Sequence, residues 1–461
     1  MKLHILGVAG TFMGGVAALA RELGHEVSGS DQAIYPPMST QLEQLQIRLH
    51  QGYDAAAIDA DVDEIVIGNA LSRGNSAVEA VLNQGRKYNS GAQWLAENVL
   101  PGRDVLAVAG THGKTTTTSI LTYLLQAAGL EPGFLVGGVA EDFGTSARIG
   151  KGRAFVVEAD EYDTAFFDKR SKFVHYHPLI AILNNLEFDH ADIFDNVQQI
   201  QRQFHHLVRT VPQRGRLIVN GEDRYLREVL DMGAWTPVET FGLDASASTN
   251  GQPFTWSAEL LNDDGSAFTV LHNGQPVGDV QWPLLGRHNV MNALAAIAAA
   301  HAEGADIASA LPALQQFNSV KRRLEVIGEH NDVVVYDDFA HHPTAIATTL
   351  AGLRAKVGEA RIVVAMEPRS NSMRLGAHSD ALAPSLDDAD EVVFLQRPEL
   401  PWDADKVIGA LKHNGQTAAD VDALLALLMD IVRPGDHVVF MSNGGFDAAP
   451  RRFHASWVSA G

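Results

Sequence analysis

Short apolar runs alternate with glycine-rich turns and helical stretches over the first hundred residues. Apolar runs at 3–8, 26–30 and 64–68 predict strands, and a helix is predicted at 16–23 between the first two. Short apolar runs that are bounded by turn residues and separated by helices are typical of a parallel sheet with helical crossovers. After a break near 317–319 the last third repeats this alternation, with predicted strands at 333–336, 361–365, 391–395 and 437–441.

The middle of the chain mixes two patterns. Apolar runs at 105–108, 154–157 and 179–183 predict buried strands, whereas 214–285 alternates short strands with hairpin turns, and a long alanine-rich helix is predicted at 293–302. At about 150 residues per domain, 461 residues suggest three domains. We therefore expect an α/β protein with a Rossmann-like domain at 1–102, a central P-loop ATPase-like mixed sheet at 103–318 and a second Rossmann-like domain at 319–461.

Composition excludes several classes of protein. The formal net charge of −21 argues against a nucleic-acid partner or a membrane surface, since both attract clustered Lys and Arg. The chain has no cysteine, which excludes disulfides, a Cys-ligated zinc site and thiol catalysis. No apolar run approaches the roughly 20 residues of a membrane span, and the N-terminus has no cleavage-site pattern. We expect a soluble, cytoplasmic protein that takes small-molecule ligands.

The segment 109–118 carries the strongest chemical signal. A predicted strand leads into Gly110-Thr111-His112-Gly113-Lys114-Thr115, and a helical pattern follows. In such a turn the backbone N–H groups face the phosphates of a nucleotide, the lysine reaches the β/γ oxygens and the threonine hydroxyl is available to Mg²⁺. The spacing is a short G-x-x-G-K-T. It predicts binding of ATP or GTP.

A second glycine-rich turn lies near the N-terminus. It contains Gly7, Gly10, Gly14 and Gly15, and the next predicted strand ends at Asp31. Glycines allow close approach to a pyrophosphate, and an acid at that position can reach a ribose hydroxyl. Ala9 interrupts the strict dinucleotide pattern. NAD, FAD or a nucleotide-sugar diphosphate would all fit, and so would a turn needed only for packing.

Acidic and basic side chains follow the other predicted strands. We call the glycine-rich turn at 110–115 the phosphate loop. Glu158 is the first choice for a Mg²⁺ ligand, because it ends the predicted strand downstream of this loop. Asp160, Glu161 and Asp163 could be ligands or a solvated acidic turn. His190, between Asp189 and Asp192, is a candidate for a second metal site or a surface residue beside a helix cap. Two arginines at 367–374 could hold carboxylates.

Taken in order, these segments resemble the Mur ligase family over almost the whole chain. The matching motifs are G-T-H-G-K-T-T-T at 110–117, E-A-D-E at 158–161, N-x-E-x-D-H at 185–190, G-R-H-N at 286–289, R-R at 322–323 and D-D-F-A-H-H-P at 337–343. The first and last of them are similar to the branch that acts on UDP-N-acetylmuramate. One type of ligase in this branch adds L-alanine during peptidoglycan synthesis, and another adds L-alanyl-γ-D-glutamyl-meso-diaminopimelate during peptidoglycan recycling.

Other phrases are similar to the tripeptide-adding type. They are the long segment 158–176, Y-P-P-M-S-T at 35–40, N-N-L-E-F-D-H-A-D-I-F at 184–194, E-P-R-S-N-S-M at 367–373 and M-S-N-G-G-F at 441–446. The resemblance implies an ADP-forming ligase that phosphorylates the lactyl carboxylate of UDP-N-acetylmuramate and lets the tripeptide amine attack the acyl phosphate. The L-alanine-adding activity is the alternative.

The resemblance also implies roles for particular residues. Those expected to bind ATP are Gly110, Thr111, His112, Gly113, Lys114, Thr115, Thr116, His288, Asn292, Arg323 and Asp338. Those expected to bind the UDP-sugar are Gly10, Gly14, Ser30 and Asp31, and those expected to bind the peptide are Arg369, Asn371 and Arg374. Mg²⁺ ligands would be Thr115, Glu158 and His190, and the implied catalytic residues are Lys114, His190, Arg323 and His341.

Two features depart from the family pattern. Several members have a carbamylated lysine after the D-H-x-D motif, but no lysine occurs from 173 through 320, so His205, His206 or water would complete a second metal site. The segment 447–452 after Phe446 is also not predicted to form the terminal helix expected at this place.

Three other functions remain open from the sequence. Folylpolyglutamate and cyanophycin synthetases share the reaction class but need no UDP-sugar. An NAD-dependent oxidoreductase with a regulatory ATP domain would use the N-terminal glycine turn for its cofactor. A nucleotide sensor would bind ATP and the UDP-sugar without releasing ADP.

Overall fold

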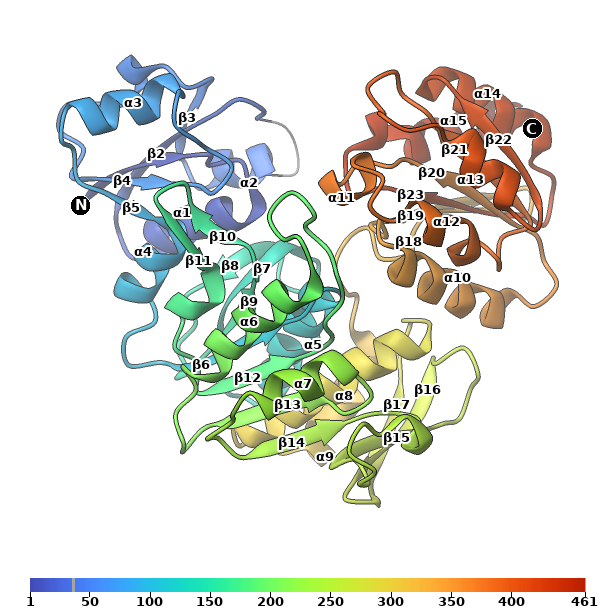
Figure 1. Ribbon diagram of the computed structural model, residues 1–461, viewed down its shortest axis with the longest axis horizontal. Coiled ribbons are helices and arrows are strands. Elements are labelled where there is room, and N and C mark those ends of the chain that lie inside the picture. The colour runs from blue at the N-terminus through green and yellow to red at the C-terminus, as the bar shows by residue number, and fades with distance from the viewer. Residues whose placement is uncertain (35–37, 461) are drawn as a thin grey trace.

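The computed structural model describes residues 1–34 and 38–460, and its three main sheets occupy successive parts of the chain (Figure 1). The phrase at 35–40 falls partly outside the described residues. In Figure 1 the N-terminal part lies at the upper left, the C-terminal part at the upper right, and the central part below and between them. The expected α/β architecture with a mixed central sheet is confirmed.

The first sheet is parallel, with strand order β3-β2-β1-β4-β5. Its strands are β1 (Lys2–Leu6), β2 (Glu26–Asp31), β3 (Arg48–Gln51), β4 (Glu64–Ile67) and β5 (Tyr88–Ser90), and its helices are α1 (Thr11–Glu22), α2 (Met38–Gln44), α3 (Ser76–Asn83) and α4 (Gly91–Asn98). Helix α1 begins earlier than predicted because extended Gly10 caps it. The strand order reverses at β1, so the glycine-rich turn lies where such sheets bind ligands.

The central sheet has ten strands in the order β17-β16-β15-β14-β13-β12-β6-β9-β7-β8. Its strands are β6 (Asp104–Ala109), β7 (Gly133–Ala140), β8 (Thr145–Arg148), β9 (Ala154–Ala159), β12 (Ile180–Leu183), β13 (Arg216–Asn220), β14 (Val238–Phe241), β15 (Trp256–Leu260), β16 (Ala267–His272) and β17 (Gln275–Gln281). Strands β10 (Asp163–Ala165) and β11 (Asp168–Ser171) form a separate antiparallel hairpin. The strands from β14 to β7 are parallel, whereas β16, β17 and β8 add antiparallel edges.

The two faces of the central sheet are covered differently. Helices α5 (Lys114–Ala127), α8 (Arg287–Ala302) and α9 (Ile307–Ala310) cover one face, and α6 (Val197–Val208) and α7 (Arg224–Asp231) contribute to the apolar core on the other. Helix α7 lies where only strands and turns were predicted. Asp223 caps it by accepting from the N–H groups of Tyr225 and Leu226, and its two buried apolar side chains are one turn apart, too few for a clear periodic signal.

The C-terminal sheet has the order β18-β19-β23-β20-β21-β22, in which only β18 is antiparallel to its neighbour. Its strands are β18 (Glu325–His330), β19 (Val333–Asp338), β20 (Ile362–Met366), β21 (Glu391–Leu395), β22 (Asn414–Ala418) and β23 (His437–Met441). Its helices are α10 (Pro343–Val357), α11 (Asn371–Arg374), α12 (Ser379–Ser385), α13 (Asp405–Ala410), α14 (Val421–Ile431) and α15 (Ala449–Ala460). Five short 3-10 segments complete the list: 55–57, 172–175, 245–247, 311–316 and 446–448.

The prediction that no terminal helix follows Phe446 is wrong. Residues 446–448 have positive φ angles and turn the chain, and α15 then runs from Ala449 to Ala460. Pro450 lies in its first turn, where the missing N–H has no partner to lose, so it does not break the helix. Phe453 is fully buried and anchors the helix on the sheet.

The three parts are joined unequally. Apolar side chains of α1 and α4 belong to one continuous core with β6, β7, β9 and α6 of the central sheet. A Cβ on Gly15 of α1 would lie 3.2 Å from Leu135 and 3.5 Å from Ala147, so this helix rests directly on β7 and β8. The C-terminal sheet has separate cores on its two faces. Among the described residues, no helix is long and apolar enough to cross a membrane.

We predict that the first sheet loses stability in mild acid because of His4. Its ring is fully buried, with Nδ1 2.8 Å from Ser28 Oγ and Nε2 3.0 Å from Ser30 Oγ. Burial, together with His50 and Arg48, lowers the pKa of His4 to about 4. A lowered histidine pKa contributes stability above the unfolded value, about 6.5, which is lost as the pH falls towards 4. The loss at pH 5 should be about 2 kcal/mol.

Hydrogen exchange of the β1 and β2 amides in the intact chain, corrected for the intrinsic pH dependence, would measure this loss. His4→Gln cannot be protonated, and should remove most of the pH dependence between 7.5 and 5. Equal pH dependence in the wild type and the variant would show that His4 is not its source.

Candidate functional site

The phosphate loop joins the end of β6 to the start of α5, as its sequence predicts. Gly113 has φ +74°, and a Cβ there would lie 2.4 Å from Asn292 Oδ1. The loop is also tied to the segment after β12. The N–H of His112 donates to Asn185 Oδ1 at 2.7 Å, and that of Thr111 donates to the Asn185 carbonyl at 3.1 Å. These contacts tie the loop to the segment after β12.

Lys114 is held by two acceptors. Its Nζ donates to the Gly110 carbonyl at 2.6 Å and to Glu161 Oε2 at 3.0 Å. Burial disfavours the charged amine, but Glu161, Asp160 and Glu158 outweigh this effect and raise the pKa of Lys114. Lys114 is therefore a cation at neutral pH, with its charge fixed at the loop.

Glu161 links Lys114 to His190. Its side chain is 2% exposed, and its Oε1 lies 3.3 Å from His190 Nε2. Burial alone would raise the pKa of Glu161, but Lys114 and His190 lower it to about 2. The same carboxylate and Asp189 raise the pKa of His190 against its own burial. Sequence reasoning missed this role, although Glu161 stands in the quoted E-A-D-E motif.

The alternative of a solvated acidic turn at 160–163 is wrong for Asp160 and Glu161, which are both buried. Asp160 Oδ2 accepts from Lys172 Nζ at 3.2 Å. The Lys172 amine is 3% exposed and lies 4.4 Å from the ring centre of Phe12 in the first domain. A buried lysine thus stands immediately before the lysine-free span that begins at 173.

Glu158 and Thr115 meet at the end of the phosphate loop, as predicted. Thr115 Oγ1 donates to Glu158 Oε1 at 3.0 Å, and the Gly137 N–H donates to Glu158 Oε2 at 2.7 Å. Burial and the neighbouring Asp160 raise the pKa of Glu158. A hydroxyl and a carboxylate are the hard oxygen donors that Mg²⁺ prefers, so the donor set fits this ion.

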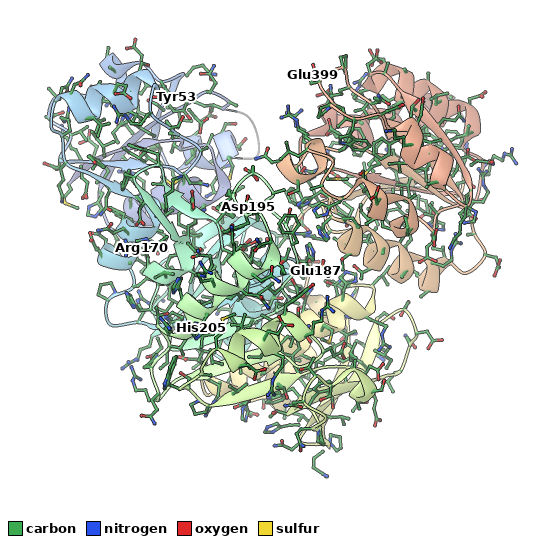
Figure 2. All side chains as sticks on the ribbon, viewed as in Figure 1. Tyr53, Arg170, Glu187, Asp195, His205 and Glu399 are labelled. Atoms are coloured by element: carbon green, nitrogen blue, oxygen red, sulfur yellow. The ribbon has the colours of Figure 1, made fainter. Side chains whose placement is uncertain are left out.

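His205 and His206, which were expected to replace a bridging lysine, have other surroundings in the structure. His205 of α6 has its Nε2 3.1 Å from the Gly233 carbonyl oxygen, beyond the end of α7 (Figure 2). His206, the next residue on the same helix, is half-buried, and its pKa is lowered by burial and by Arg209.

Asn292 joins α8 to the phosphate-loop helix. Its Oδ1 accepts from Thr117 Oγ1 at 3.1 Å and from Asn184 Nδ2 at 2.9 Å. The Oδ1 atom of Asn292 therefore links α8 to α5 and to the segment after β12. Near the start of the same helix, His288 has a buried Nδ1 that makes no hydrogen bond within the described residues. Burial and Arg323 lower the pKa of His288 to about 4.

The C-terminal domain contributes the segments around 323 and 338–341. Arg323 lies with its guanidinium 5.3 Å from the ring centre of Phe339. Asp338 is buried and accepts from the N–H groups of Leu324 and Ala340, each at 2.7 Å. His341 Nδ1 lies 2.9 Å from the Phe339 carbonyl oxygen, and burial lowers the pKa of His341 to about 4.

The loop at 370–372 docks onto the loop at 189–192 of the central domain. Ser372 Oγ donates to Asp189 Oδ1 at 2.6 Å, and Asn371 Nδ2 donates to Asp192 Oδ2 at 2.8 Å. Asn371, predicted to bind the peptide, thus makes an interdomain contact here. Arg369 and Arg374 on the same loop are exposed.

The N-terminal glycine turn surrounds Asp31. Asp31 Oδ2 accepts from the Ala9 N–H at 2.9 Å. A Cβ on Gly14 would lie 2.1 Å from Met38 Cε, so α1 packs closely against the start of α2 at this glycine. The hydroxyl of Ser30 is fully buried and hydrogen-bonded to His4, so it is already engaged within the first domain.

Three family models match successive parts of the chain. Residues 2–101 match the model of the Mur ligase family catalytic domain, 108–300 the Mur ligase middle domain, and 322–444 the Mur ligase glutamate ligase domain.

Three relatives illustrate the range of similarity. The UDP-N-acetylmuramate–L-alanyl-γ-D-glutamyl-meso-2,6-diaminoheptandioate ligase of Escherichia coli K12 is 54% identical, covering 97% of this chain and 96% of the relative. A crystal structure of a murein peptide ligase from Psychrobacter arcticus 273-4 matches with a TM-score of 0.76 and 45% identity, covering 99% and 98% of the two chains. The UDP-N-acetylmuramate–L-alanine ligase of Desulforapulum autotrophicum is 31% identical, covering 96% and 95%.

A 54% identity over nearly the full length of both proteins, together with the ordered motifs around Lys114, Glu158 and His190, leads to one conclusion. This chain belongs to the Mur ligase family, whose members are ATP-dependent amide ligases.

Proposed function

We propose that this protein joins L-alanyl-γ-D-glutamyl-meso-diaminopimelate to UDP-N-acetylmuramate, with conversion of ATP to ADP and phosphate, in the recycling of peptidoglycan. The observation that carries the proposal is the 54% identity to the Escherichia coli ligase of that name, against 31% to an L-alanine-adding relative. Substrates of this kind, ATP and a UDP-sugar, support action in the cytoplasm. The proposed domain limits are 1–102 for the UDP-sugar, 103–318 for ATP and 319–461 for the peptide.

The first chemical step is phosphoryl transfer. An oxygen of the lactyl carboxylate attacks the γ-phosphorus of ATP, the bond to the ADP oxygen breaks, and an acyl phosphate forms. Lys114 and Arg323 would stabilise the charge on the transferred group, and Glu161 keeps the Lys114 amine charged and in place. Thr115 and Glu158, and at a second position His190, would hold Mg²⁺, which when bound neutralises phosphate charge.

The second step forms the amide. The tripeptide amine attacks the carbonyl carbon of the acyl phosphate, and the tetrahedral intermediate expels phosphate. His341 is proposed to lie near the phosphates. Because its Nδ1 faces the carbonyl oxygen of Phe339, which can only accept, Nδ1 carries the proton and Nε2 is the basic nitrogen.

The remaining proposed roles concern binding. His288, Asn292 and Asp338 would lie around the adenosine. Gly10, Gly14 and Asp31 would face the uridine diphosphate, with Ser30 contributing its backbone, because its hydroxyl is bonded to His4. Arg369 and Arg374 are exposed at the 367–374 loop and would pair with peptide carboxylates.

The acceptor is tested by ADP release with ATP, Mg²⁺ and UDP-N-acetylmuramate. We expect turnover with the tripeptide to exceed turnover with L-alanine by at least about 100-fold, because binding contacts along the peptide stabilise the transition state. Faster turnover with L-alanine would assign the biosynthetic reaction instead. Omitting the UDP-sugar should abolish ADP release with either acceptor.

The phosphate loop is tested by Gly113→Ala. The new Cβ would meet Asn292 Oδ1 at 2.4 Å at a backbone φ of +74°, so we expect ATP affinity to fall at least about tenfold. Gly129→Ala is the matched control, because Gly129 has φ +76° but open space around it. Titration with a fluorescent ATP analogue would measure both variants. Equal affinities in the two would contradict the assigned loop geometry.

The peptide site is tested by the double variant Arg369→Ala/Arg374→Ala. Loss of two charge-assisted contacts should raise the KM for the tripeptide about 10- to 100-fold and leave the KM for ATP within about twofold. Exposed Arg433, just after α14, gives the control variant Arg433→Ala. An unchanged tripeptide KM in the double variant would remove these arginines from the site.

A further inference from the structure

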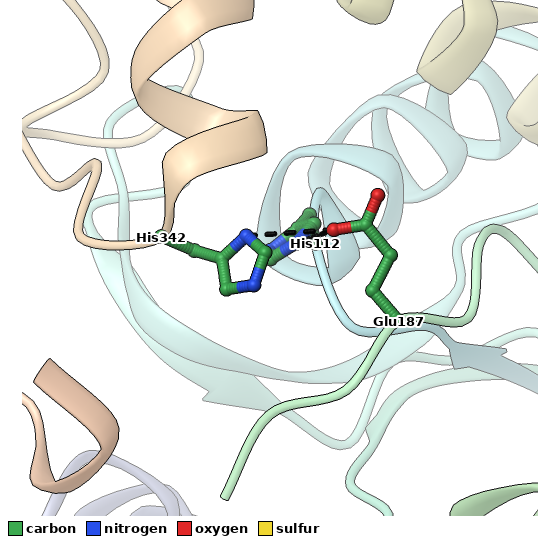
Figure 3. Close-up of side chains that lie close together, drawn as sticks. All are labelled: His112, Glu187 and His342. Carbon is green, nitrogen blue, oxygen red and sulfur yellow. Dashed lines mark hydrogen bonds and ion pairs between the residues drawn. The ribbon is translucent and has the colours of Figure 1, made fainter. Parts of the chain in front are cut away.

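Three potential metal ligands from separate segments converge between the central and C-terminal domains. His112 belongs to the phosphate loop, Glu187 lies in the segment after β12, and His342 is the residue that caps the start of α10 (Figure 3). His112 Nε2 lies 3.1 Å and His342 Nδ1 lies 3.4 Å from Glu187 Oε2, and the three ligand atoms are all within 4.8 Å of one another. Figure 2 shows Glu187 on the side of the central domain that faces the C-terminal domain.

We infer that His112, Glu187 and His342 form a binding site for a first-row transition metal ion of the zinc class, separate from the proposed Mg²⁺ ligands Thr115, Glu158 and His190. Ligands at about 2.0–2.1 Å from a tetrahedral zinc ion are about 3.3 Å apart. The distances of 3.1 Å and 3.4 Å from Glu187 Oε2 bracket this separation. A water molecule or a ligand atom would take the fourth position.

The contacts of His342 Nδ1 are long enough to be exchanged for a bond to a cation. This nitrogen accepts from the Thr344 N–H at 3.3 Å at the start of α10, and it lies 3.4 Å from the carboxylate oxygen of Glu187. An unprotonated imidazole nitrogen has one lone pair in the plane of the ring. A metal ion bound there would therefore replace the hydrogen bond from Thr344 and would be attracted by the Glu187 carboxylate.

The donor set selects the class of ion. Imidazole nitrogens suit zinc, copper, nickel and iron, whereas Mg²⁺ prefers oxygen donors and an octahedral shell. Two imidazoles and one carboxylate are a common zinc ligand set with an open fourth position. Millimolar Mg²⁺ should therefore leave this site free for zinc.

An ion at this site would tie two domains together. Glu187 already accepts from Thr344 Oγ1 at 2.7 Å, so the site lies on an existing contact between them. The C-terminal domain has its own apolar cores and meets the central domain here through polar side chains. Coordination would therefore hold the C-terminal domain in this orientation against the phosphate loop.

The test is zinc affinity of the intact chain without substrates, measured by competition with a chromophoric chelator in excess Mg²⁺. We expect one tight equivalent, and at least about 100-fold weaker binding in both His342→Gln and Glu187→Gln. His378→Gln is the matched control, because that ring lies 4.5 Å from the His342 ring but outside the cluster. Its affinity should match that of the wild type.

Other outcomes would overturn the site. If the wild type binds zinc no more tightly than His342→Gln and Glu187→Gln do, the cluster is only a hydrogen-bonded contact. Equal losses in His378→Gln and His342→Gln would move the site to other ligands. A second readout is hydrogen exchange, in which zinc should protect the amides of 185–188 together with those of His341, His342 and Thr344 in the wild type and in His378→Gln, but not in His342→Gln or Glu187→Gln. Because no substrate is present, these results are independent of the proposed ligase reaction.

Discussion

The buried contact between Lys114 and Glu161 is the interaction on which the rest of the site depends. A lysine that is largely enclosed needs a partner, and Glu161, itself 2% exposed, lies 3.0 Å away. Removing one member of a buried ion pair costs about 3–5 kcal/mol, because the other charge is left without compensation. The second oxygen of Glu161 faces His190, so one carboxylate contacts both Lys114 of the phosphate loop and a proposed metal ligand.

Much of this arrangement could be predicted from local sequence. The phosphate loop and most parallel strands follow from short apolar runs that end in glycines, acids or threonine, and these signals lie within a few residues. Helix α15 was missed although Pro450 stands in its first turn, where a proline does not break a helix. Helix α7 was missed because its capping aspartate and two buried side chains give a weak pattern.

Side-chain pairings between distant segments could not be predicted. Glu161 was noted as one of the acids that follow a predicted strand. Nothing in the local sequence shows that its side chain contacts Lys114, 47 residues away, instead of solvent. Asn371 was expected to meet a peptide, and its partner in this structure is Asp192, 179 residues earlier. The cluster of His112, Glu187 and His342 needs two domains to be placed side by side. Such contacts depend on domain packing, which no periodic pattern encodes.

The close packing of α1 on β7 and β8 affects how the protein unfolds. One apolar core runs through the first two domains, so unfolding either domain would expose apolar side chains of the other. The two domains should therefore unfold as one cooperative unit. Among the described residues, the buried apolar clusters of the C-terminal domain are separate from that core, and its polar contacts can be replaced by water. On heating, the chain should therefore show two calorimetric transitions, although it has three main sheets.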